Sequence, residues 1–257
     1  MTLIRSSPVT IALDARAIDK RVGLILLATD HTSEADFAKL VASERIGIFA
    51  TRINYANPVT PENLRAMQPR LEAAARMLLP DEELDAICFS CSSASVVIGD
   101  AAVEAAVQAG KPGVPVVTPA SAAVGALKAL GARRISVLTP YTETTSAPMA
   151  DYFEAAGFEL DRFTAMGLED DREMARISRE TLVDAASEAL DPASDALFIS
   201  CTALRASSLV SEIEARTGRP VVTSNQASAW ACIAHCGIAP SRTDAGRLMS
   251  LATAKAA

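Results

Sequence analysis

The sequence has few aromatic residues and no long apolar run. Only 4% of its 257 residues are Phe, Trp or Tyr, and no stretch approaches the roughly 18 consecutive apolar residues that a membrane-spanning helix needs. Asp14, Arg16 and Asp19 interrupt the N-terminal segment, so it does not resemble a secretory signal peptide. We therefore expect a soluble, cytoplasmic protein that has no membrane partner.

Basic residues are scarce relative to acidic ones. The chain has 24 Lys and Arg against 31 Asp and Glu, which gives a net charge of −7. Nucleic-acid-binding domains usually carry a basic patch that meets the phosphate backbone, and no such patch is visible. Half of the residues are hydrophobic, which is typical of a globular chain, and we expect no nucleic-acid partner.

The common cofactor and nucleophile motifs are missing. No Gly-x-Gly occurs, so the dinucleotide fingerprint is absent, and there is neither a Gly-x-x-x-x-Gly-Lys phosphate loop nor a Gly-x-Ser-x-Gly elbow. The five cysteines are odd in number in a large chain, which argues against a disulfide framework. We therefore expect reduced thiols and chemistry that needs no cofactor and no metal.

Short apolar runs alternate with Ala-rich helical stretches along the chain. Strands are expected at residues 22–28, 47–52, 85–90, 114–118, 134–139, 196–200 and 220–223, and helices at 34–44, 61–79, 95–109, 121–130, 147–156, 179–190 and 207–217. Gly131, Gly157 and Gly218 stand where helices should end. This alternation predicts βαβ units, a parallel sheet and the α/β class.

An internal duplication divides the chain into two related α/β halves. The segment Asp85-Ala-Ile-Cys-Phe-Ser-Cys91 matches Asp195-Ala-Leu-Phe-Ile-Ser-Cys201, and a Pro-Val-Val-Thr strand follows each, at residues 115–118 and 220–223. Two such halves facing each other would form a cleft. Ligands of open parallel sheets bind beyond the carboxyl ends of the strands, where Cys91 and Cys201 both fall.

The repeated cysteine context favours a functional pair of thiols. A single free cysteine is more often a small buried residue, but Cys91 and Cys201 occupy the same place in both halves. Backbone N–H groups at a helix start can lower the pKa of a thiol, so catalytic thiols should alkylate with an apparent pKa below about 8. Two such thiols could act as acid and base, or as nucleophile and acid, on opposite sides of one carbon.

Other cysteine and histidine patterns are weaker. Cys88 and Cys91 form a Cys-x-x-Cys, but strand alternation separates them and the second half has Phe198 in place of Cys88. Cys232, His235 and Cys236 have a spacing that suits a metal, but no second ligand pair accompanies them, which favours helix packing. His31 follows the first strand and either lines the cleft or makes a structural hydrogen bond.

These residues resemble the aspartate/glutamate racemase superfamily, in the branch of maleate isomerase and arylmalonate decarboxylase. The resemblance covers residues 20–240 and rests on Cys91-Ser-Ser, Thr139-Pro-Tyr141, Cys201-Thr-Ala and Val59-Thr-Pro-Glu-Asn. Within the branch the chain is most similar to the ectoine-utilisation proteins. The resemblance implies two pseudo-symmetric Rossmann-like domains, with parallel sheets and an active-site cleft between them. The first would hold residues 1–118 plus 230–257 and the second residues 119–229, since the helix after each Pro-Val-Val-Thr strand would cross to the opposite domain.

The resemblance also implies roles for individual residues. Cys91 matches the nucleophile of maleate isomerases and Cys201 the acid/base, while in racemases the two thiols serve as opposed bases. Backbone and hydroxyl groups of a substrate-binding set would hold a carboxylate: Ser92, Ser93, Tyr141, Thr202 and Ala203. The decarboxylases have no cysteine at the first position, so Cys91 argues against simple decarboxylation.

Two aspartates depart from the maleate isomerase pattern. Where that family has Asn after the first strand and after a Gly-Leu-Glu-Asp-like stretch, this chain carries Asp30 and Asp171. An ionised Asp only accepts hydrogen bonds and would repel a second substrate carboxylate, so these positions suit a cationic or N–H-bearing group. Ectoine and diaminobutyrate derivatives carry such a group, although the same residues would also fit simple helix caps.

We therefore expect a cofactor-independent isomerase or racemase of a small carboxylic acid. Cys91 and Cys201 would act on the reacting carbon, and Asp30, His31 and Asp171 would select the rest of the substrate. Three alternatives remain: a ligand-binding relative with vestigial cysteines, an arylmalonate decarboxylase-like lyase, and a redox protein that uses Cys88 and Cys91. Family resemblance and the high Ala content allow a homodimer.

Overall fold

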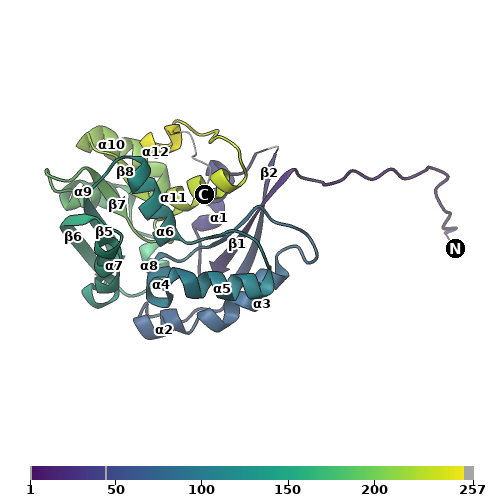
Figure 1. The fold of residues 1–257 in the computed structure, drawn as a ribbon, viewed down its shortest axis with the longest axis horizontal. Helices are drawn as coiled ribbons and strands as arrows, with labels where there is room; N and C mark the ends of the chain where they lie inside the picture. Colours follow the sequence, from purple (N-terminus) through teal and green to yellow (C-terminus); the bar gives the residue numbers. More distant parts are fainter. Residues whose placement is uncertain (1, 44, 252–257) are drawn as a thin grey trace.

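The protein contains two parallel four-stranded sheets. The computed structural model describes residues 2–43 and 45–251. The strand order is β2-β1-β3-β4 in the first sheet and β6-β5-β7-β8 in the second, and every strand pair is parallel. Figure 1 shows the two sheets side by side with helices around them. The expected α/β fold with two similar halves is confirmed.

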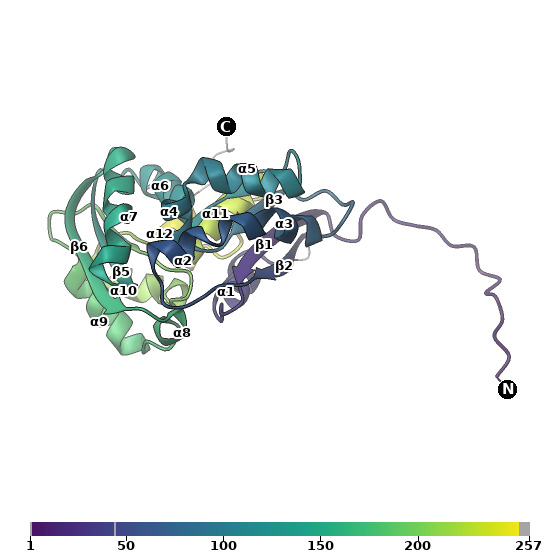
Figure 2. The same ribbon diagram turned by 90° about the horizontal axis from the view of Figure 1, so that it is seen from below.

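The first half of the described chain builds the first sheet. Residues 2–19 precede it without regular structure, and residues 2–15 extend away from the body (Figures 1 and 2). Its elements are β1 (Lys20–Leu27), α1 (Ser33–Leu40), β2 (Ile46–Ile53), α2 (Pro61–Arg65), η1 (Gln68–Arg70), α3 (Leu71–Met77), β3 (Ala86–Phe89), α4 (Ser92–Ile98), α5 (Asp100–Gly110) and β4 (Val116–Val117).

The second half repeats the same order of strands. Its elements are α6 (Pro119–Ala129), β5 (Arg134–Tyr141), α7 (Glu143–Ala155), β6 (Glu159–Leu168), α8 (Asp171–Met174), α9 (Arg179–Ala189), β7 (Ala196–Ile199), η2 (Ser207–Leu209), α10 (Val210–Thr217), β8 (Val221–Thr223), α11 (Ser224–His235) and α12 (Arg247–Ser250). Among the residues that the structure describes, no helix is both long and apolar enough to cross a membrane.

Two predicted helices are interrupted. The helix expected at 61–79 consists of α2, η1 and α3, and Thr60 caps its start by accepting a hydrogen bond from the Asn63 N–H at 3.3 Å. The helix expected at 95–109 begins earlier and is broken at Gly99, whose φ of +92° suits glycine and few other residues. As a result α4 starts directly after Cys91, and its N-terminus points at that residue.

The sequence analysis does not predict strand β6. β6 is an edge strand with three charged residues in its first four positions, and most of its side chains are half-buried. A half-exposed edge strand lacks the continuous apolar run of a central parallel strand, so its sequence resembles a loop.

The central strands β3 and β7 place the two cysteines. Every residue of both strands is buried, and each strand is the third in its sheet. The register is equivalent: Ser90 N–H donates to the Ile25 carbonyl of β1, and Ser200 N–H donates to the Leu138 carbonyl of β5. Cys91 and Cys201 follow at once, so matched topology brings both to the carboxyl ends of their sheets.

Two helices join the halves. α6 leaves the first sheet and packs against β8 of the second, while α11 leaves the second sheet and packs against β3 and β4 of the first. The two helices also pack against each other in the middle of the molecule (Figure 2). These contacts agree with the crossing that the resemblance implies, and the domain limits of 118, 119, 229 and 230 stay a prediction.

Candidate active site

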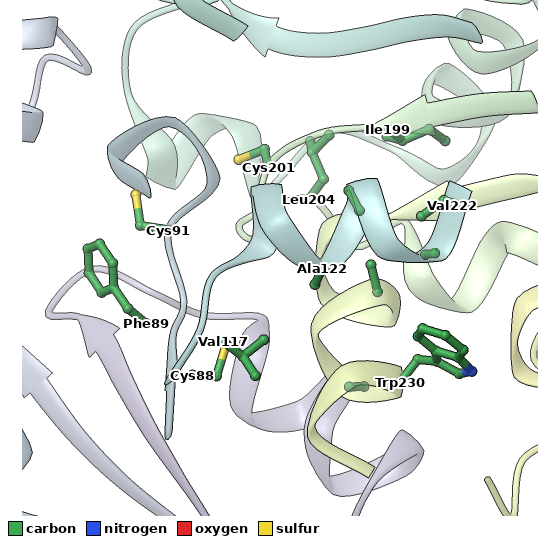
Figure 3. Close-up of a cluster of buried hydrophobic side chains, with 14 of the residues drawn as sticks. Cys88, Phe89, Cys91, Val117, Ala122, Ile199, Cys201, Leu204, Val222 and Trp230 are labelled. Atoms are coloured by element: carbon green, nitrogen blue, oxygen red, sulfur yellow. The ribbon is translucent and has the colours of Figure 1, made fainter. Parts of the chain in front are cut away.

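A small cavity lies where the two cysteine turns meet. Its walls combine the two thiols with hydroxyl, carboxylate and apolar groups from both halves. The lining residues are Leu27, Asp30, Tyr55, Val59, Leu64, Cys91, Ser93, Tyr141, Asp171, Met174, Cys201, Thr202 and Ala203. In Figure 3 the Cys201 sulfur is turned toward the turn that carries Cys91.

Cys91 stands in a relaxed turn at the start of a helix. Its backbone is extended, with φ −153° and ψ 109°, and it is the N-cap residue of α4. Its thiol lies 3.8 Å from the Ser93 hydroxyl and receives the backbone N–H of Ala94. The start of α4 therefore directs N–H groups at this sulfur.

Cys201 stands in a strained turn that starts no regular α-helix. Its φ is +112°, a conformation that side chains other than glycine rarely adopt. The backbone N–H groups of Ala203 and Leu204 reach its thiol, and the phenol of Tyr141 hydrogen-bonds it. Tyr141 also contacts Ser93 of the opposite half, so one phenol connects the two turns.

Burial keeps both thiols protonated in the closed cavity. It raises the pKa of Cys91 to about 12, and the N–H of Ala94 and the hydroxyl of Ser93 offset this only in part. Burial likewise raises the pKa of Cys201 to about 11 against the lowering effect of Tyr141. The desolvation of a thiolate thus outweighs the N–H groups around it. An alkylation pKa below about 8, which would mark these thiols as catalytic, stays a prediction.

Ser224 links the two turns behind the cavity. Its hydroxyl accepts the Cys201 N–H at 3.0 Å and the Ser92 hydroxyl at 2.7 Å. Ser92 therefore faces Ser224 and does not line the cavity, unlike the neighbouring Ser93. The sequence analysis does not identify Ser224 as a site residue. The repeat nevertheless distinguishes it, because the two halves differ at this position: Pro119 follows the first Pro-Val-Val-Thr and Ser224 follows the second.

The Cys201 turn is also held by hydrogen bonds to its carbonyl groups, from Thr32 of the first half and from Asn225 of α11. The Ala203 carbonyl accepts from the Thr32 hydroxyl at 2.7 Å, and the Thr202 carbonyl accepts from the Asn225 amide at 3.0 Å. The Thr202 hydroxyl donates its proton to the Ser90 carbonyl at 3.2 Å, so this hydroxyl is not free to donate to a ligand. These bonds hold a turn that has no helix to stabilise it.

Asp30 and Asp171 both line the cavity, and both have partners in the protein. Asp30 accepts the N–H groups of Thr32 and Ser33 and the Ser33 hydroxyl, in the manner of a helix cap, while burial raises its pKa. Asp171 accepts from the Asn57 amide at 2.8 Å and from the Thr29 hydroxyl. Each carboxylate retains acceptor capacity toward the cavity.

His31 lies outside this cavity. Its side chain is exposed and lines a separate surface pocket with Asp36, Lys39 and Arg205. His31 is the neighbour of Asp30 in the sequence, but Asp30 lines the cavity and His31 lines the surface pocket.

The remaining cysteines belong to the core. Cys88 lies beside Val117 and away from the Cys91 sulfur (Figure 3), and its thiol contacts Cys232 of α11. Within residues 2–43 and 45–251, no group of three or more His, Cys, Asp or Glu side chains is placed to hold a metal ion. Cys232, His235 and Cys236 thus form no such group.

Several lining residues were missed from the sequence. They are Leu27, Tyr55, Val59, Leu64 and Met174, most of which are apolar. The sequence around an apolar residue does not indicate that it lines a site. That these residues surround one cavity is visible only in the assembled structure. No Lys, Arg or His is among the residues that line the cavity.

Comparisons with known proteins agree with this geometry. The family described as arylmalonate decarboxylase matches residues 40–249. The maleate isomerase of Nocardia farcinica is 28% identical over 242 residues, which cover 90% of this chain and 95% of that protein. The arylmalonate decarboxylase of Bordetella bronchiseptica is 32% identical over 139 residues, which cover 53% of this chain and 58% of that protein.

A solved structure gives the same fold. A cysteine-to-serine mutant of the Nocardia farcinica maleate cis-trans isomerase, with a covalently bound succinylcysteine intermediate, superposes with a TM-score of 0.80 at 27% identity. The match covers 90% of this chain and 98% of that structure. By its sequence match, its paired sheets and its cysteine-lined cavity, the chain belongs to the arylmalonate decarboxylase family.

Proposed function

We propose that the protein is a cofactor-independent isomerase of a small carboxylic acid, and that Cys91 and Cys201 carry the reaction. One observation supports this above all: a thiol from each half lines the same small cavity. Two separate protein groups can then act on two faces of one substrate carbon skeleton, which is what inversion or cis–trans isomerisation requires.

The two thiols can perform either reaction without a cofactor. In racemisation, one thiolate removes the proton from the α-carbon, and the other thiol gives a proton to the opposite face. In cis–trans isomerisation, a thiolate adds to one carbon of the double bond, the resulting C–C single bond rotates, and the thiolate leaves again. Both routes pass through an enolate-like carboxylate, which must be stabilised.

Hydroxyl and N–H groups beside the thiols suit that carboxylate. Tyr141 and Ser93 line the cavity and contact each other across the two halves. We assign them to the carboxylate together with backbone N–H groups of the turns at Thr202 and Ala203. Ser92 would act at a distance, because it reaches the Cys201 turn through Ser224.

The charge of the cavity supports a substrate with a cationic or N–H group. Asp30 and Asp171 line it, and none of the described lining residues is Lys, Arg or His, so both carboxylates would repel a second substrate carboxylate. A substrate cation would instead provide the missing positive charge and favour a thiolate. This supports a role for ectoine or diaminobutyrate derivatives over maleate.

Proton NMR in D₂O tests the proposal. The protein, Cys91→Ala and Cys201→Ala are incubated with maleate, amino acids, ectoine and diaminobutyrate derivatives. We expect the native protein alone to exchange an α-proton, or move a double bond, in a nitrogen-bearing acid. Conversion of maleate to fumarate would contradict the substrate class, and activity within tenfold of the native protein in both variants would contradict the mechanism.

Ligand binding without chemistry is the competing function. The raised pKa values of Cys91 and Cys201 favour it, because buried neutral thiols are poor nucleophiles. A decarboxylase-like reaction also fits the family, and release of CO₂ from an arylmalonate in the same panel would show it. Saturable binding of one compound with no chemical change in any of them would establish the binding function.

Two other expectations stay predictions. We infer a cytoplasmic location and a homodimer from composition and resemblance alone. Sedimentation velocity at micromolar concentration would decide the oligomeric state.

A further inference from the structure

The Tyr55 hydroxyl is a buried polar group with no hydrogen-bond partner among the described residues. Tyr55 lies in the loop between β2 and α2, and it lines the cavity together with Cys91 and Cys201. Most buried hydroxyl groups are paired, because burying an unpaired one is costly. Of the six such side-chain atoms among the described residues, the Tyr55 hydroxyl alone belongs to a residue that lines the cavity, and this position points to a ligand.

The surroundings of Tyr55 keep it neutral. Burial raises the pKa of its phenol well above the ordinary value, and the nearby Cys91, Asp171 and Cys201 raise it further. The hydroxyl therefore keeps its proton at any physiological pH. It faces the cavity as a hydrogen-bond donor without an acceptor.

The other two tyrosines differ from Tyr55 because their hydroxyl groups have partners within the protein. Tyr152 donates its hydroxyl proton to the Asp100 carboxylate at 2.6 Å, away from the cavity. Tyr141 uses its hydroxyl on Cys201 and Ser93. The protein thus employs two of its three phenols internally and leaves the third free beside the reacting thiols.

We propose that Tyr55 is a specificity-determining residue that donates a hydrogen bond to an acceptor oxygen of the substrate, outside the carboxylate held by Tyr141 and Ser93. The inference rests on the proposed function and narrows its substrate class. Asp30 and Asp171 only accept hydrogen bonds, whereas Tyr55 has a proton to give. A substrate group that binds an aspartate and Tyr55 together must carry an N–H donor and an oxygen acceptor close to each other.

An amide meets that requirement and an ammonium group does not. An amide N–H donates to an aspartate while its carbonyl accepts from Tyr55. An ammonium group offers donors only and leaves the Tyr55 proton unpaired. The cavity therefore takes an N-acylated amino acid, or a comparable acid that carries an amide, in preference to the free amino acid.

The test compares matched ligands on matched variants. Native protein, Tyr55→Phe and Tyr152→Phe are titrated calorimetrically with 2,4-diaminobutyrate and with its N-acetyl derivatives, and turnover is followed by NMR. We expect the native protein to bind an N-acetyl compound more tightly than the free amine. Tyr55→Phe should weaken the N-acetyl compound about tenfold or more and the free amine little, so the preference collapses. Tyr152→Phe should leave both affinities unchanged.

Stability provides a readout that does not depend on turnover. Tyr55→Phe removes an unpaired hydroxyl and should leave the melting temperature unchanged or raised, while Tyr152→Phe breaks a formed bond and should lower it. An equal fall in both variants, an unchanged preference in Tyr55→Phe, or a native preference for the free amine would each overturn the inference. Failure of the proposed function alone would look different: N-acetyl binding that depends on Tyr55, with no turnover of any compound.

Discussion

The turns that carry Cys91 and Cys201 occupy equivalent places in the two sheets and differ in how they are built. The Cys91 turn has an ordinary extended backbone and continues into α4, whose N-terminus faces the thiol. The Cys201 turn has a positive φ and no following α-helix, and hydrogen bonds from Ser224, Thr32 and Asn225 hold it. The first turn continues into a helix, and the second is held by side chains of α11 and of the first half.

This difference shows how a duplicated unit can serve one asymmetric reaction. The sulfur of Cys91 is contacted by the Ala94 N–H and the Ser93 hydroxyl, both from the first turn of its own helix. The sulfur of Cys201 is contacted by the Tyr141 phenol and by the N–H groups of Ala203 and Leu204, all from its own half. The two thiols therefore meet different hydrogen-bond donors although their strands are equivalent.

Among substitutions that test the difference between the two turns, Ser224→Ala should have the largest effect on stability. Loss of its hydroxyl leaves the Cys201 N–H and the Ser92 hydroxyl without a buried acceptor, which should reduce the free energy of unfolding by about 1–3 kcal/mol and lower activity. Ser92→Ala removes only one of these groups and should cost less. Urea denaturation of both variants measures the difference, and equal losses would show that Ser224 does not hold the Cys201 turn.

Removing the hydroxyl group beside one thiol should change the alkylation midpoint of that thiol and not of the other. Burial raises the pKa of both thiols, and Tyr141 lowers that of Cys201 while Ser93 lowers that of Cys91. Tyr141→Phe should therefore shift the alkylation midpoint of Cys201 upward by about one pH unit, and Ser93→Ala should shift that of Cys91. Mass spectrometry of iodoacetamide-treated protein resolves the two sites. A shift of both midpoints in either variant would mean that the thiols share one environment.

Glycine substitution should have opposite effects at the two cysteines. At φ +112°, Cys201→Gly relieves strain that Cys201→Ala retains, so the glycine variant should be the more stable by about 1 kcal/mol. Cys91 has a negative φ, so Cys91→Gly should be less stable than Cys91→Ala by about 0.5–1 kcal/mol. Thermal denaturation of the four variants checks this. The same order at both sites would contradict the strained conformation.

The smallest difference should appear in the pH dependence of stability. Both thiols have an ordinary pKa of 9.0, raised by burial to about 12 in Cys91 and about 11 in Cys201. Their neutral state stabilises the fold fully below pH 9. Above it, only the unfolded chain loses these protons, so the free energy of unfolding should fall by up to about 1.4 kcal/mol per pH unit for each thiol. Cys91→Ala should remove slightly more of this decline than Cys201→Ala in unfolding curves from pH 8 to 11, and an unchanged decline in both would refute the buried-thiol assignment.

Much of this comparison could be predicted from the sequence. The repeat around Cys91 and Cys201 indicated two similar halves and a shared site, because matching strands bring matching residues to the same edge of a sheet. The strained φ of Cys201 could not be predicted, since no residue type at that position marks it. The bridging role of Ser224 depends on the contact with Ser92, which forms only when the halves meet. The raised pKa of each thiol was missed for the same reason: a helix start is visible in a sequence, and the burial that overrides it is not.

The most direct test of the paired-thiol account is a double-mutant cycle on the substrate that the NMR panel identifies. Activity is measured for the native protein, Cys91→Ala, Cys201→Ala and the double variant. If the thiols act as one unit, each single substitution should reduce kcat by about a thousandfold or more, and the double variant should lose little beyond that. Independent, multiplying losses, or a single variant that stays within tenfold of the native rate, would contradict the account.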